Sequence, residues 1–392
     1  MVHPLALPAL RARPDIGHVD SFGERVVRIF DATAKADGIA LDWIRVGRGH
    51  VTIGSKESAM RARDRFRLPG AVTFLCVLAL AASSCGSDSS SSAPTAPPPL
   101  PVGWYAQLSN TAFPLFSVRF VTPTRGVAVG EGGTIRRTID GGRTWLAPFV
   151  TSVERLNAVA FGDSATGVVV GLEGTPLRTV DGGLTWTEPQ TPARSVLNAV
   201  AFTNDSTAIA VGSGGRIYRS SDRGNTWSLV YNGGQSQRAL FSVSFADVLN
   251  GVAVGSLGVT VGTEDGGQTW EQRSIGAAPL LRGVWITDAN KGIAVGDGGT
   301  MLNTVDGGVH WELQRLGIIA ALTGICFAGA DTGTVVGYAG TILRTTDGGQ
   351  NWLPQASGTL LDLYDVFFTD GRTGSAVGKD GTALRTTTGG EQ

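Results

Sequence analysis

The segment Thr345-Thr-Asp-Gly-Gly-Gln-Asn-Trp352 decides the fold, because variants of it recur along the chain. The other copies end at Trp145, Trp186, Trp227, Trp270 and Trp311, spaced by 41 residues except for one interval of 43. A seventh copy, Thr386-Thr-Thr-Gly-Gly390, has Thr388 in place of the Asp and stops before its Trp. Trp104, which lies 41 residues before Trp145, supplies the missing Trp at the other end of the chain.

Each repeat contains further strand-forming motifs around this segment. They are Leu-x-x-Val-x-Phe, then Gly-x-Ala-Val-Gly after a short turn, then Ile/Leu-x-Arg-Thr after a Gly-rich turn. Four short strands repeated about every 40 residues are typical of a β-propeller blade. We therefore predict an all-β, seven-bladed β-propeller over residues 103–392, with four-stranded blades of about 41 residues. The strand around Trp104 is expected to complete the last blade and remove its free edge.

The recurring pattern Ser/Thr-x-Asp-x-Gly-x-Thr-Trp matches the Asp-box, which is also found in bacterial sialidases, sortilin-type receptors and some endoglucanases. Its Asp carboxylate can accept hydrogen bonds from N–H groups of its own loop, and the following Gly permits a positive φ. The Trp can then fill the space between blades. Regular repetition favours a structural role over catalysis for these carboxylates, which are Asp140, Asp181, Asp222, Asp265, Asp306 and Asp347.

Composition narrows the classes of function. Lys+Arg number 32 against 33 Asp+Glu, which is too little net charge for an electrostatic nucleic-acid binder. Three of the four His precede residue 51 and only His310 lies further on, so neither His-centred catalysis nor a multi-His metal site is expected in the repeats. Cys326 is the one cysteine of the repeat region, so we predict no zinc site and no disulfide framework there. We expect no cofactor and no metal.

The segment before the repeats has the features of an export signal. Four Arg between residues 61 and 67 precede an apolar run, Ala71–Ala82, that is too short to span a bilayer. We predict a signal peptide over residues 60–84. The small residues before Cys85 resemble a bacterial lipobox, which implies lipidation of Cys85; a plain secreted protein is the alternative. Residues 85–102 are rich in Ser and Pro and predict a tether.

Residues 1–59 precede the predicted signal, although a signal peptide must be read at the N-terminus. We expect a start codon assigned too early, with Met60 as the true start and residues 1–59 as a disordered extension. The predicted location is the cell envelope, where the protein is lipid-anchored on the periplasmic side or the cell surface. The anchor would be its only contact with the membrane.

The repeats resemble the photosystem II assembly and stability factor family of cyanobacteria and chloroplasts, together with its uncharacterised bacterial relatives. The resemblance rests on Gly-x-Ala-Val-Gly and Arg-Thr-x-Asp-Gly-Gly and covers residues 103–392. It implies a non-enzymatic propeller that binds a membrane-protein partner, with an arginine-rich surface involved in binding. The Arg of the motif is present as Arg137, Arg178, Arg219, Arg344 and Arg385, and is replaced at Gly262 and Asn303. An alternative for these arginines is pairing with a carboxylate or carbonyl of the neighbouring blade.

Positions that break the repeat point to a binding surface at one mouth of the channel. Loops that enter the first strand and the Gly-rich second turns share this mouth, and Arg and Tyr are favoured in recognition surfaces. The candidate partner-binding residues are Arg155, Arg194, Arg238, Arg282, Phe241, Tyr231, Tyr338 and Tyr364. The alternative is that they are solvated loop residues. We predict a monomeric binding or assembly-scaffold propeller that engages a protein partner in the cell envelope and no nucleic acid.

The main rival function is a carbohydrate-active or carbohydrate-binding propeller. A sialidase needs three clustered Arg, a Tyr nucleophile and acid/base carboxylates, and no such arrangement is legible. For an endoglucanase, Asp362 and Asp365 are the best carboxylate pair, but strand alternation places them on opposite faces. Neither a Gly-x-Ser-x-Gly motif nor a phosphate loop occurs in residues 103–392. We therefore predict no catalytic residues.

Overall fold

The computed structural model describes residues 26–27, 43–47, 50–54, 102–148, 154–172, 176–189, 195–234, 236–274 and 279–391. The chain divides into two units, Met1–Ala96 and Pro97–Gln392. In the first unit, β1 (Val26–Val27), β2 (Trp43–Gly47) and β3 (His50–Gly54) form an antiparallel sheet. The predicted signal peptide, Cys85 and all but the last residue of the predicted tether lie outside the described residues, so these expectations stay predictions. No helix in the described residues is long and apolar enough to cross a membrane.

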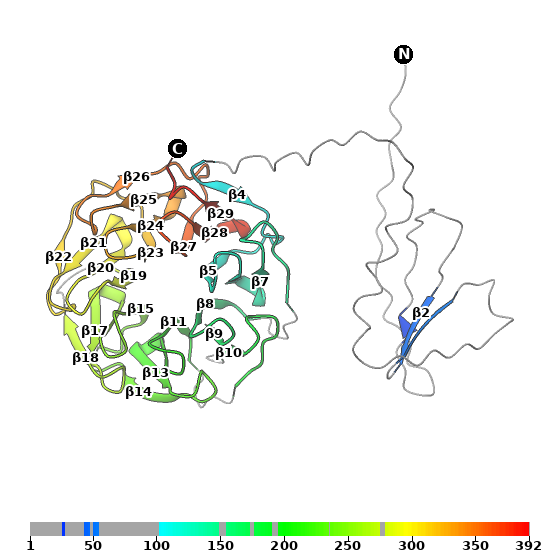
Figure 1. Cartoon of the computed structure of the whole chain (residues 1–392). Coiled ribbons are helices and arrows are strands. Elements are labelled where there is room, and N and C mark those ends of the chain that lie inside the picture. The colour runs from blue at the N-terminus through cyan, green and yellow to red at the C-terminus, as the bar shows by residue number, and fades with distance from the viewer. Residues whose placement is uncertain are drawn as a thin grey trace, which may run out of the picture. The chain divides into compact units, whose positions relative to one another are not determined.

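The second unit is a seven-bladed β-propeller, as predicted. Figure 1 shows the blades arranged in a ring, each beginning with its innermost strand. In order from blade 1 to blade 7, the inner strands are β5 (Leu115–Phe120), β8 (Leu156–Phe161), β11 (Leu197–Phe202), β15 (Leu240–Phe245), β19 (Leu281–Ile286), β23 (Leu322–Phe327) and β27 (Leu363–Phe368).

The second strand of each blade is fully buried over its five residues, because it is covered by the blades on both sides. These strands are β6 (Gly126–Gly130), β9 (Gly167–Gly171), β12 (Ala208–Gly212), β16 (Gly251–Gly255), β20 (Gly292–Gly296), β24 (Gly333–Gly337) and β28 (Gly374–Gly378). Single 3-10 turns follow most of them: η2 (Glu131–Gly133), η4 (Ser213–Gly215), η5 (Ser256–Gly258), η6 (Asp297–Gly299), η7 (Tyr338–Gly340) and η8 (Lys379–Gly381).

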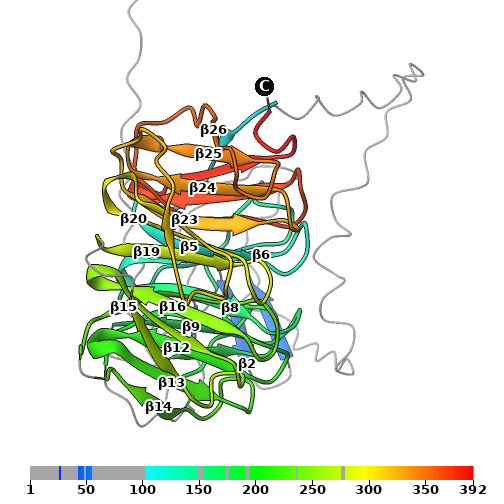
Figure 2. The same cartoon turned by 90° about the vertical axis from the view of Figure 1, so that its left-hand side faces the viewer.

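Each blade continues antiparallel into a third strand, as the side view in Figure 2 shows for β23, β24 and β25, and in the described residues five of the seven blades add a fourth strand further out. The third strands are β7 (Ile135–Thr138), β10 (Leu177–Thr179), β13 (Arg216–Ser220), β17 (Val259–Thr263), β21 (Met301–Thr304), β25 (Ile342–Thr345) and β29 (Ala383–Thr386). The fourth strands are β14 (Ser228–Asn232), β18 (Glu271–Ser274), β22 (Glu312–Leu313), β26 (Leu353–Pro354) and β4 (Tyr105–Gln107). In blades 1 and 2 a single antiparallel bridge stands in for the fourth strand: Leu146 pairs with Arg137 in blade 1, and Thr187 pairs with Arg178 in blade 2.

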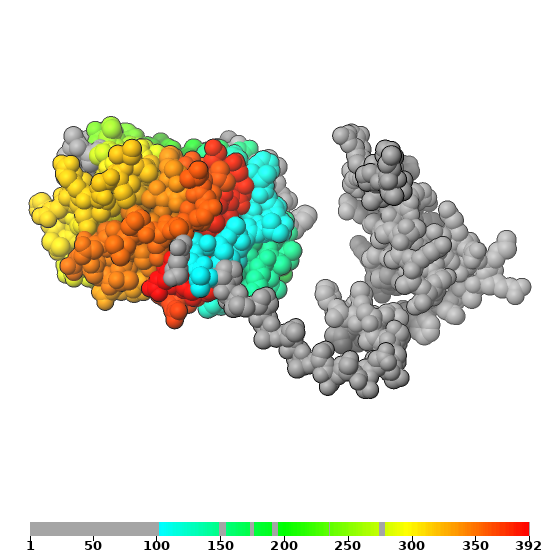
Figure 3. Space-filling view, turned by 90° about the horizontal axis from the view of Figure 1, so that it is seen from above, coloured from blue at the N-terminus to red at the C-terminus, as the bar shows by residue number. Residues whose placement is uncertain are grey.

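The N-terminal strand closes the ring, as predicted from the position of Trp104. β4 pairs antiparallel with β29, and in Figure 3 the cyan start of the propeller lies against its red end. The Trp104 ring meets Phe368 edge-on at 5.7 Å, as Trp145 meets Phe120 in blade 1. The Gly103 N–H donates to Thr388 Oγ1 at 3.1 Å, so the hydroxyl that replaces the seventh Asp still joins the two ends of the chain.

Candidate functional site

A β-bulge at one repeated position turns a side chain into the channel mouth. In every inner strand the pairing register slips at the second residue, for example between Leu115 and Ser117 in β5. The extra residue of a bulge is unpaired and its side chain is re-aimed. The seven bulged residues are Phe116, Asn157, Asn198, Phe241, Arg282, Thr323 and Tyr364, and all of them line one cavity of about 320 Å³ in the channel.

Three of these seven side chains hold the ring together. Asn157 Nδ2 donates to Leu197 O at 2.9 Å, and Asn198 Nδ2 donates to Leu240 O at 2.7 Å. Thr323 Oγ1 donates to Leu363 O at 2.7 Å. Each bond runs to the inner strand of the next blade, so a polar residue here is structural. The other four positions carry large aromatic or charged side chains instead.

Three of those four belong to a continuous row of planar groups that we call the mouth cluster. The Arg155 guanidinium lies over the Phe116 ring at 4.1 Å, and Phe116 contacts Tyr364 at 5.5 Å between ring centroids. Tyr364 meets Tyr338 edge-on at 6.3 Å, and Arg282 lies over the Tyr338 ring at 5.6 Å. The row runs across five consecutive blades, from blade 2 through blades 1, 7 and 6 to blade 5.

Both arginines of the mouth cluster are fixed through their Nε atoms. Arg155 Nε donates to Asn157 Oδ1 at 2.8 Å, and Arg282 Nε donates to Asp297 Oδ1 at 2.5 Å. Burial opposes the charge of Arg282, but the hydrogen bond to Asp297 together with the charges of Tyr338 and Asp297 raises the pKa of the guanidinium. Burial, with the charge of Asp362 next, also raises the pKa of Tyr364. Arg282 therefore keeps its charge and Tyr364 its phenol proton at neutral pH, and the two Nε bonds hold the arginines in place.

The remaining predicted partner-binding residues are less closely associated. Phe241 lines the channel at its bulge, and Arg238, in the loop before β15, donates to Leu257 O at 3.3 Å. Tyr231 lies in the outer strand β14, opposite Ile217, and packs half-buried on the core between blades 3 and 4, so it does not reach the channel. Arg194 lies outside the described residues.

A polar network lies deeper in the channel between blades 7 and 1. Asp365 Oδ2 accepts hydrogen bonds from Arg119 Nη1 at 2.7 Å, Ser117 Oγ at 2.9 Å and the Val118 N–H at 3.0 Å. Asp362 lies before β27, where its Oδ1 accepts from the Ala339 N–H at 3.0 Å. Asp362 and Asp365 thus make separate contacts and are not arranged as the facing carboxylate pair of an endoglucanase.

The opposite end of the propeller carries the Asp-boxes. In the first box, Asp140 Oδ1 accepts from Thr138 Oγ1 and the Thr144 N–H, both at 2.9 Å, and Oδ2 accepts from Thr144 Oγ1 at 2.6 Å. Equivalent bonds fix the other five carboxylates, with His310 Nδ1 and Asn351 Nδ2 in place of the second hydroxyl at Asp306 and Asp347: Asp181, Asp222, Asp265, Asp306 and Asp347. The second Gly of the box is also required, since Gly183 has φ +80° and a Cβ there would lie 2.8 Å from Val127 of the preceding blade.

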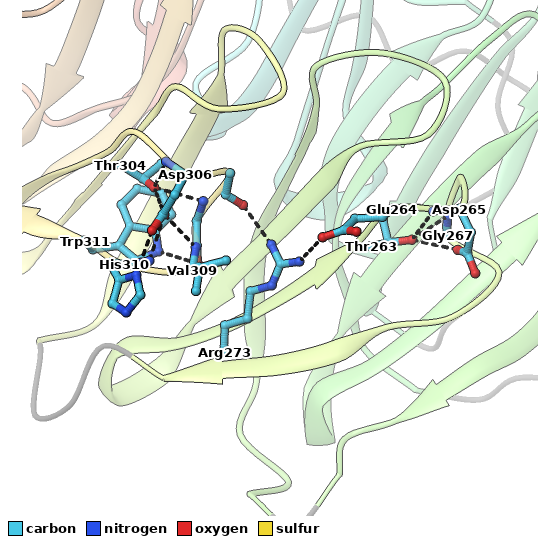
Figure 4. Close-up of polar contacts among 12 residues, drawn as sticks. Thr263, Glu264, Asp265, Gly267, Arg273, Thr304, Asp306, Val309, His310 and Trp311 are labelled. Atoms are coloured by element: carbon cyan, nitrogen blue, oxygen red, sulfur yellow. Dashed lines mark hydrogen bonds and ion pairs between the residues drawn. The ribbon is translucent and has the colours of Figure 1, made fainter.

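His310 replaces the usual Thr in the fifth box. Its Nδ1 lies 2.6 Å from Asp306 Oδ2, and its side chain is 83% exposed. Figure 4 shows the ring beside the box, with the N–H groups of Val309 and His310 directed at the same carboxylate. The backbone N–H of His310, then its side chain, lower the pKa of Asp306 to about 2. The imidazole therefore takes the place of a turn hydroxyl, and among the described residues no group of three His, Cys, Asp or Glu side chains could hold a metal ion.

All five repeat arginines donate to backbone carbonyls of the next blade. Arg137, Arg178 and Arg219 reach the Asp-box carbonyls of Gly182, Arg223 and Gly266 through Nε. Arg344 and Arg385 reach Gly371 O and Pro123 O, and lie over the rings of Phe368 at 4.5 Å and Phe120 at 5.4 Å. Burial lowers the pKa of both Arg344 and Arg385. These bonds match the alternative in which the repeat arginines pair with the neighbouring blade, and they do not match an arginine surface left free for a partner.

Where the repeat lacks this Arg, another residue takes over its bond. Gly262 leaves space that the guanidinium of Arg273, from β18, occupies; a Cβ on Gly262 would lie 2.4 Å from it. Arg273 Nη1 donates to Gly307 O at 2.8 Å and Nη2 to Glu264 Oε1 at 2.9 Å (Figure 4). At Asn303, Gln314 bridges to Gly349 O and Gln350 O. The sequence analysis does not identify Arg273 or Gln314; the available signal was their position in or just after the fourth strand, beside the position that lacks the repeat arginine.

Comparisons with known proteins agree with this architecture. A solved structure of YCF48 bound to D1 peptide is 24% identical, with a TM-score of 0.63, covering 73% of this chain and 97% of that one. YCF48 from Cyanidioschyzon merolae is 21% identical, with a TM-score of 0.60, covering 73% and 98%. The GH74 xyloglucanase from Xanthomonas campestris is 15% identical, with a TM-score of 0.57, covering 74% of this chain and 54% of that one. Identities this low show the shared fold alone.

No curated protein sequence matches the chain. A family model does: that of the photosynthesis system II assembly factor YCF48 matches residues 101–229 and 275–356, which together are more than half of the chain. The chain therefore belongs to the photosynthesis system II assembly factor YCF48 family.

Proposed function

We propose that this protein is a binding or assembly-scaffold propeller that holds a polypeptide segment of a protein partner at its channel mouth. The observation that carries the proposal is the mouth cluster. Three of its side chains, those of Phe116, Arg282 and Tyr364, stand at positions where other blades use a polar residue to bond the next blade. Four inner strands give up that bond, so the side chains present there are free to serve another purpose. Aromatic rings and arginines fixed in place are the usual anchors of protein interfaces.

The rim beside the mouth cluster adds apolar contact area. Phe113, Ile319 and Leu360 lie in the loops that enter β5, β23 and β27, and their side chains are 56%, 91% and 87% exposed. Exposed apolar groups that gather around polar anchors favour a protein interface. Membership of a family of assembly factors supports the same function, and the solved relative bound to D1 peptide is a precedent for peptide binding on this fold.

The test is affinity capture with the full-length protein in its own cells. The variant is Arg155→Ala/Arg282→Ala, and the matched control is Arg143→Ala/Arg372→Ala, which removes two exposed arginines at the Asp-box end. A specific protein that is captured by the wild type and the control, and lost from the mouth variant, supports the proposal. Equal capture by all three forms contradicts it. A glycan retained instead of a protein would favour the carbohydrate-binding alternative.

We also propose that the scaffold acts in the cell envelope, anchored through Cys85. The Arg-rich segment, the short apolar run and the small residues before Cys85 support this location. One acyl chain anchors only marginally, so the several chains of a bacterial lipoprotein are expected. The Cys85→Ala variant should move from the membrane fraction to the soluble fraction. An unmodified mature N-terminus other than Cys85, read by mass spectrometry, would contradict the anchor.

A further inference from the structure

The interface between blades 4 and 5 lacks both members of a contact that other interfaces keep. Where blade 6 meets blade 7, and where blade 7 meets blade 1, a repeat arginine lies over the Phe that ends the next inner strand, at 4.5 Å and 5.4 Å. Between blades 4 and 5 the arginine position is Gly262 and the Phe position is Ile286. The six other inner strands all end in Phe, so this interface alone lacks both groups.

A cavity of about 250 Å³ remains at this interface. Arg273 from β18 replaces the missing guanidinium, whereas Ile286 is smaller than the ring that it replaces. The apolar part of the lining consists of Val252 and Ile286, which are buried in the core between the two blades. The volume is far larger than one ordered water needs, so the cavity has room for a side chain.

The polar part of the lining is rich in hydrogen-bond acceptors. The carbonyl of Ala289 lines the cavity and, among the described residues, accepts no hydrogen bond. The equivalent carbonyls in blades 7 and 1 each accept a hydrogen bond from a repeat arginine. The carboxylates of Glu264 and Asp306 also border the cavity, with the Arg273 guanidinium between them (Figure 4). Two carboxylates and one guanidinium leave this lining with a net negative charge.

We propose that the cavity between blades 4 and 5 binds the guanidinium of one arginine side chain from a protein partner. In this arrangement the guanidinium donates to Ala289 O, and the methylene stem packs on the apolar lining. Glu264 pairs with Arg273, so the charge of Asp306 is left for the incoming group. The cavity lies at the Asp-box end, away from the mouth cluster, and the inference does not depend on the proposed function.

The experiment uses N-acetyl-L-argininamide as the probe and saturation-transfer NMR with the full-length protein. We expect saturable binding in the millimolar range, as is usual for one small group. N-acetyl-L-citrullinamide has nearly the same shape without the charge and should bind about tenfold more weakly. Ile286→Phe restores the ring of the repeat and fills the cavity, so it should weaken binding of the arginine probe by about tenfold or more. Ile286→Leu conserves the volume and should bind as the wild type does.

Glu264→Gln tests the charge without a change in the core, since the Glu264 side chain is 75% exposed. It leaves Arg273 unneutralised and should weaken binding of the arginine probe several-fold, whereas Glu312→Gln on the outer strand of blade 5 should have no effect. Near-ultraviolet circular dichroism checks that each variant is folded.

Two results would overturn the inference. One is a folded Ile286→Phe variant that binds the arginine probe as tightly as the wild type does. The other is equal binding of the arginine and citrulline probes by the wild type. If Ile286→Phe does not fold, unchanged binding by Glu264→Gln overturns the inference in its place.

Discussion

The two ends of the propeller are built from the same seven repeats and differ in how much of the repeat they keep. At the Asp-box end, the Asp-box carboxylates bond within their own turn and the repeat arginines bond the next blade, and Arg273 replaces a missing repeat arginine. At the mouth, bonds between blades are kept at Asn157, Asn198 and Thr323 and abandoned at the other four bulges. In this protein, charged residues that recur in every blade are structural. The surface available for recognition is found where the blades differ from the repeat.

The largest effect on stability is expected from the strand that closes the ring, β4. Trp104 is 7% exposed, meets Phe368 edge-on and donates from Nε1 to Gln355 Oε1 at 2.9 Å. Trp104→Ala should lower the free energy of unfolding by about 3–5 kcal/mol, measured by urea denaturation. Leu108→Ala, just after β4 and 79% exposed, is the control and should stay within about 0.5 kcal/mol of the wild type. Equal midpoints for the two variants would show that the closing strand adds no stability.

The repeat arginines should differ among themselves. Arg344 is buried, bonds Thr334 Oγ1 at 2.6 Å and Gly371 O, and lies over Phe368. Its change to Ala should cost about 2 kcal/mol, because charged hydrogen bonds are lost from a buried site. Arg178 makes its bond at the surface, so Arg178→Ala should cost less than about 1 kcal/mol. If Arg178→Ala instead abolished partner capture while leaving stability intact, recognition would extend to the Asp-box end.

The Asp-boxes predict a loss of stability in acid. Hydrogen bonds from the N–H and side chain of Asn351 lower the pKa of Asp347 to about 2, and Asp306 has a similar value. Because these folded-state pKa values lie below the unfolded value of about 3.9, ionised Asp stabilises the fold above that value. The stabilisation should disappear as the pH falls through about 2. Denaturation midpoints measured from about pH 6 to pH 2 should fall less steeply for Asp347→Asn than for the wild type or for the control Glu312→Gln, a change at an exposed outer-strand residue.

The Arg273 replacement can be tested by restoring the repeat. Gly262→Arg alone should be destabilising, because its side chain competes with the Arg273 guanidinium for the same space. Gly262→Arg combined with Arg273→Ala should recover most of the loss, since the introduced guanidinium can then reach the next blade as that of Arg219 does. The thermal midpoints of the two single variants and the double variant measure this coupling. Additive effects would mean that Arg273 is not a substitute for the repeat arginine.

The mouth should give the smallest change in stability. Arg282 and Asp297 have side chains 32% and 38% exposed, and exposed ion pairs add about 0–1 kcal/mol. Arg282→Ala should therefore leave the unfolding midpoint nearly unchanged while weakening partner binding. A loss of stability as large as that of Arg344→Ala would remove the contrast between the two ends.

The sequence was sufficient for the fold because each blade repeats the same turn and strand motifs, and the offset of Trp104 located the closure. It was less informative about the mouth. The loops of the repeat predict a common location for four residues of the mouth cluster: Arg155, Arg282, Tyr338 and Tyr364. The order in which these residues contact one another depends on which blades are neighbours in the ring. The place of Phe116 between Arg155 and Tyr364 depends on the β-bulge, which the sequence does not show. Tyr231 is close in sequence to a mouth loop, and this nearness suggested a place at the mouth. The structure places it instead on the outermost strand of its blade, β14, which the sequence alone does not reveal. Arg273 was missed because it substitutes in space for a residue on another strand.

The bulge shared by all seven inner strands has a consequence for how such a protein acquires a new partner. At four of the seven bulged positions, those of Phe116, Phe241, Arg282 and Tyr364, the side chain is not needed for strand pairing and does not make the bond to the next blade that Asn157, Asn198 and Thr323 make, so it can be exchanged with little effect on folding. The binding specificity of such a propeller can be changed by one substitution at a time, much as the loops of an antibody vary on a constant framework. Proteins with the same blades can therefore be expected to bind different partners through different side chains at these four positions.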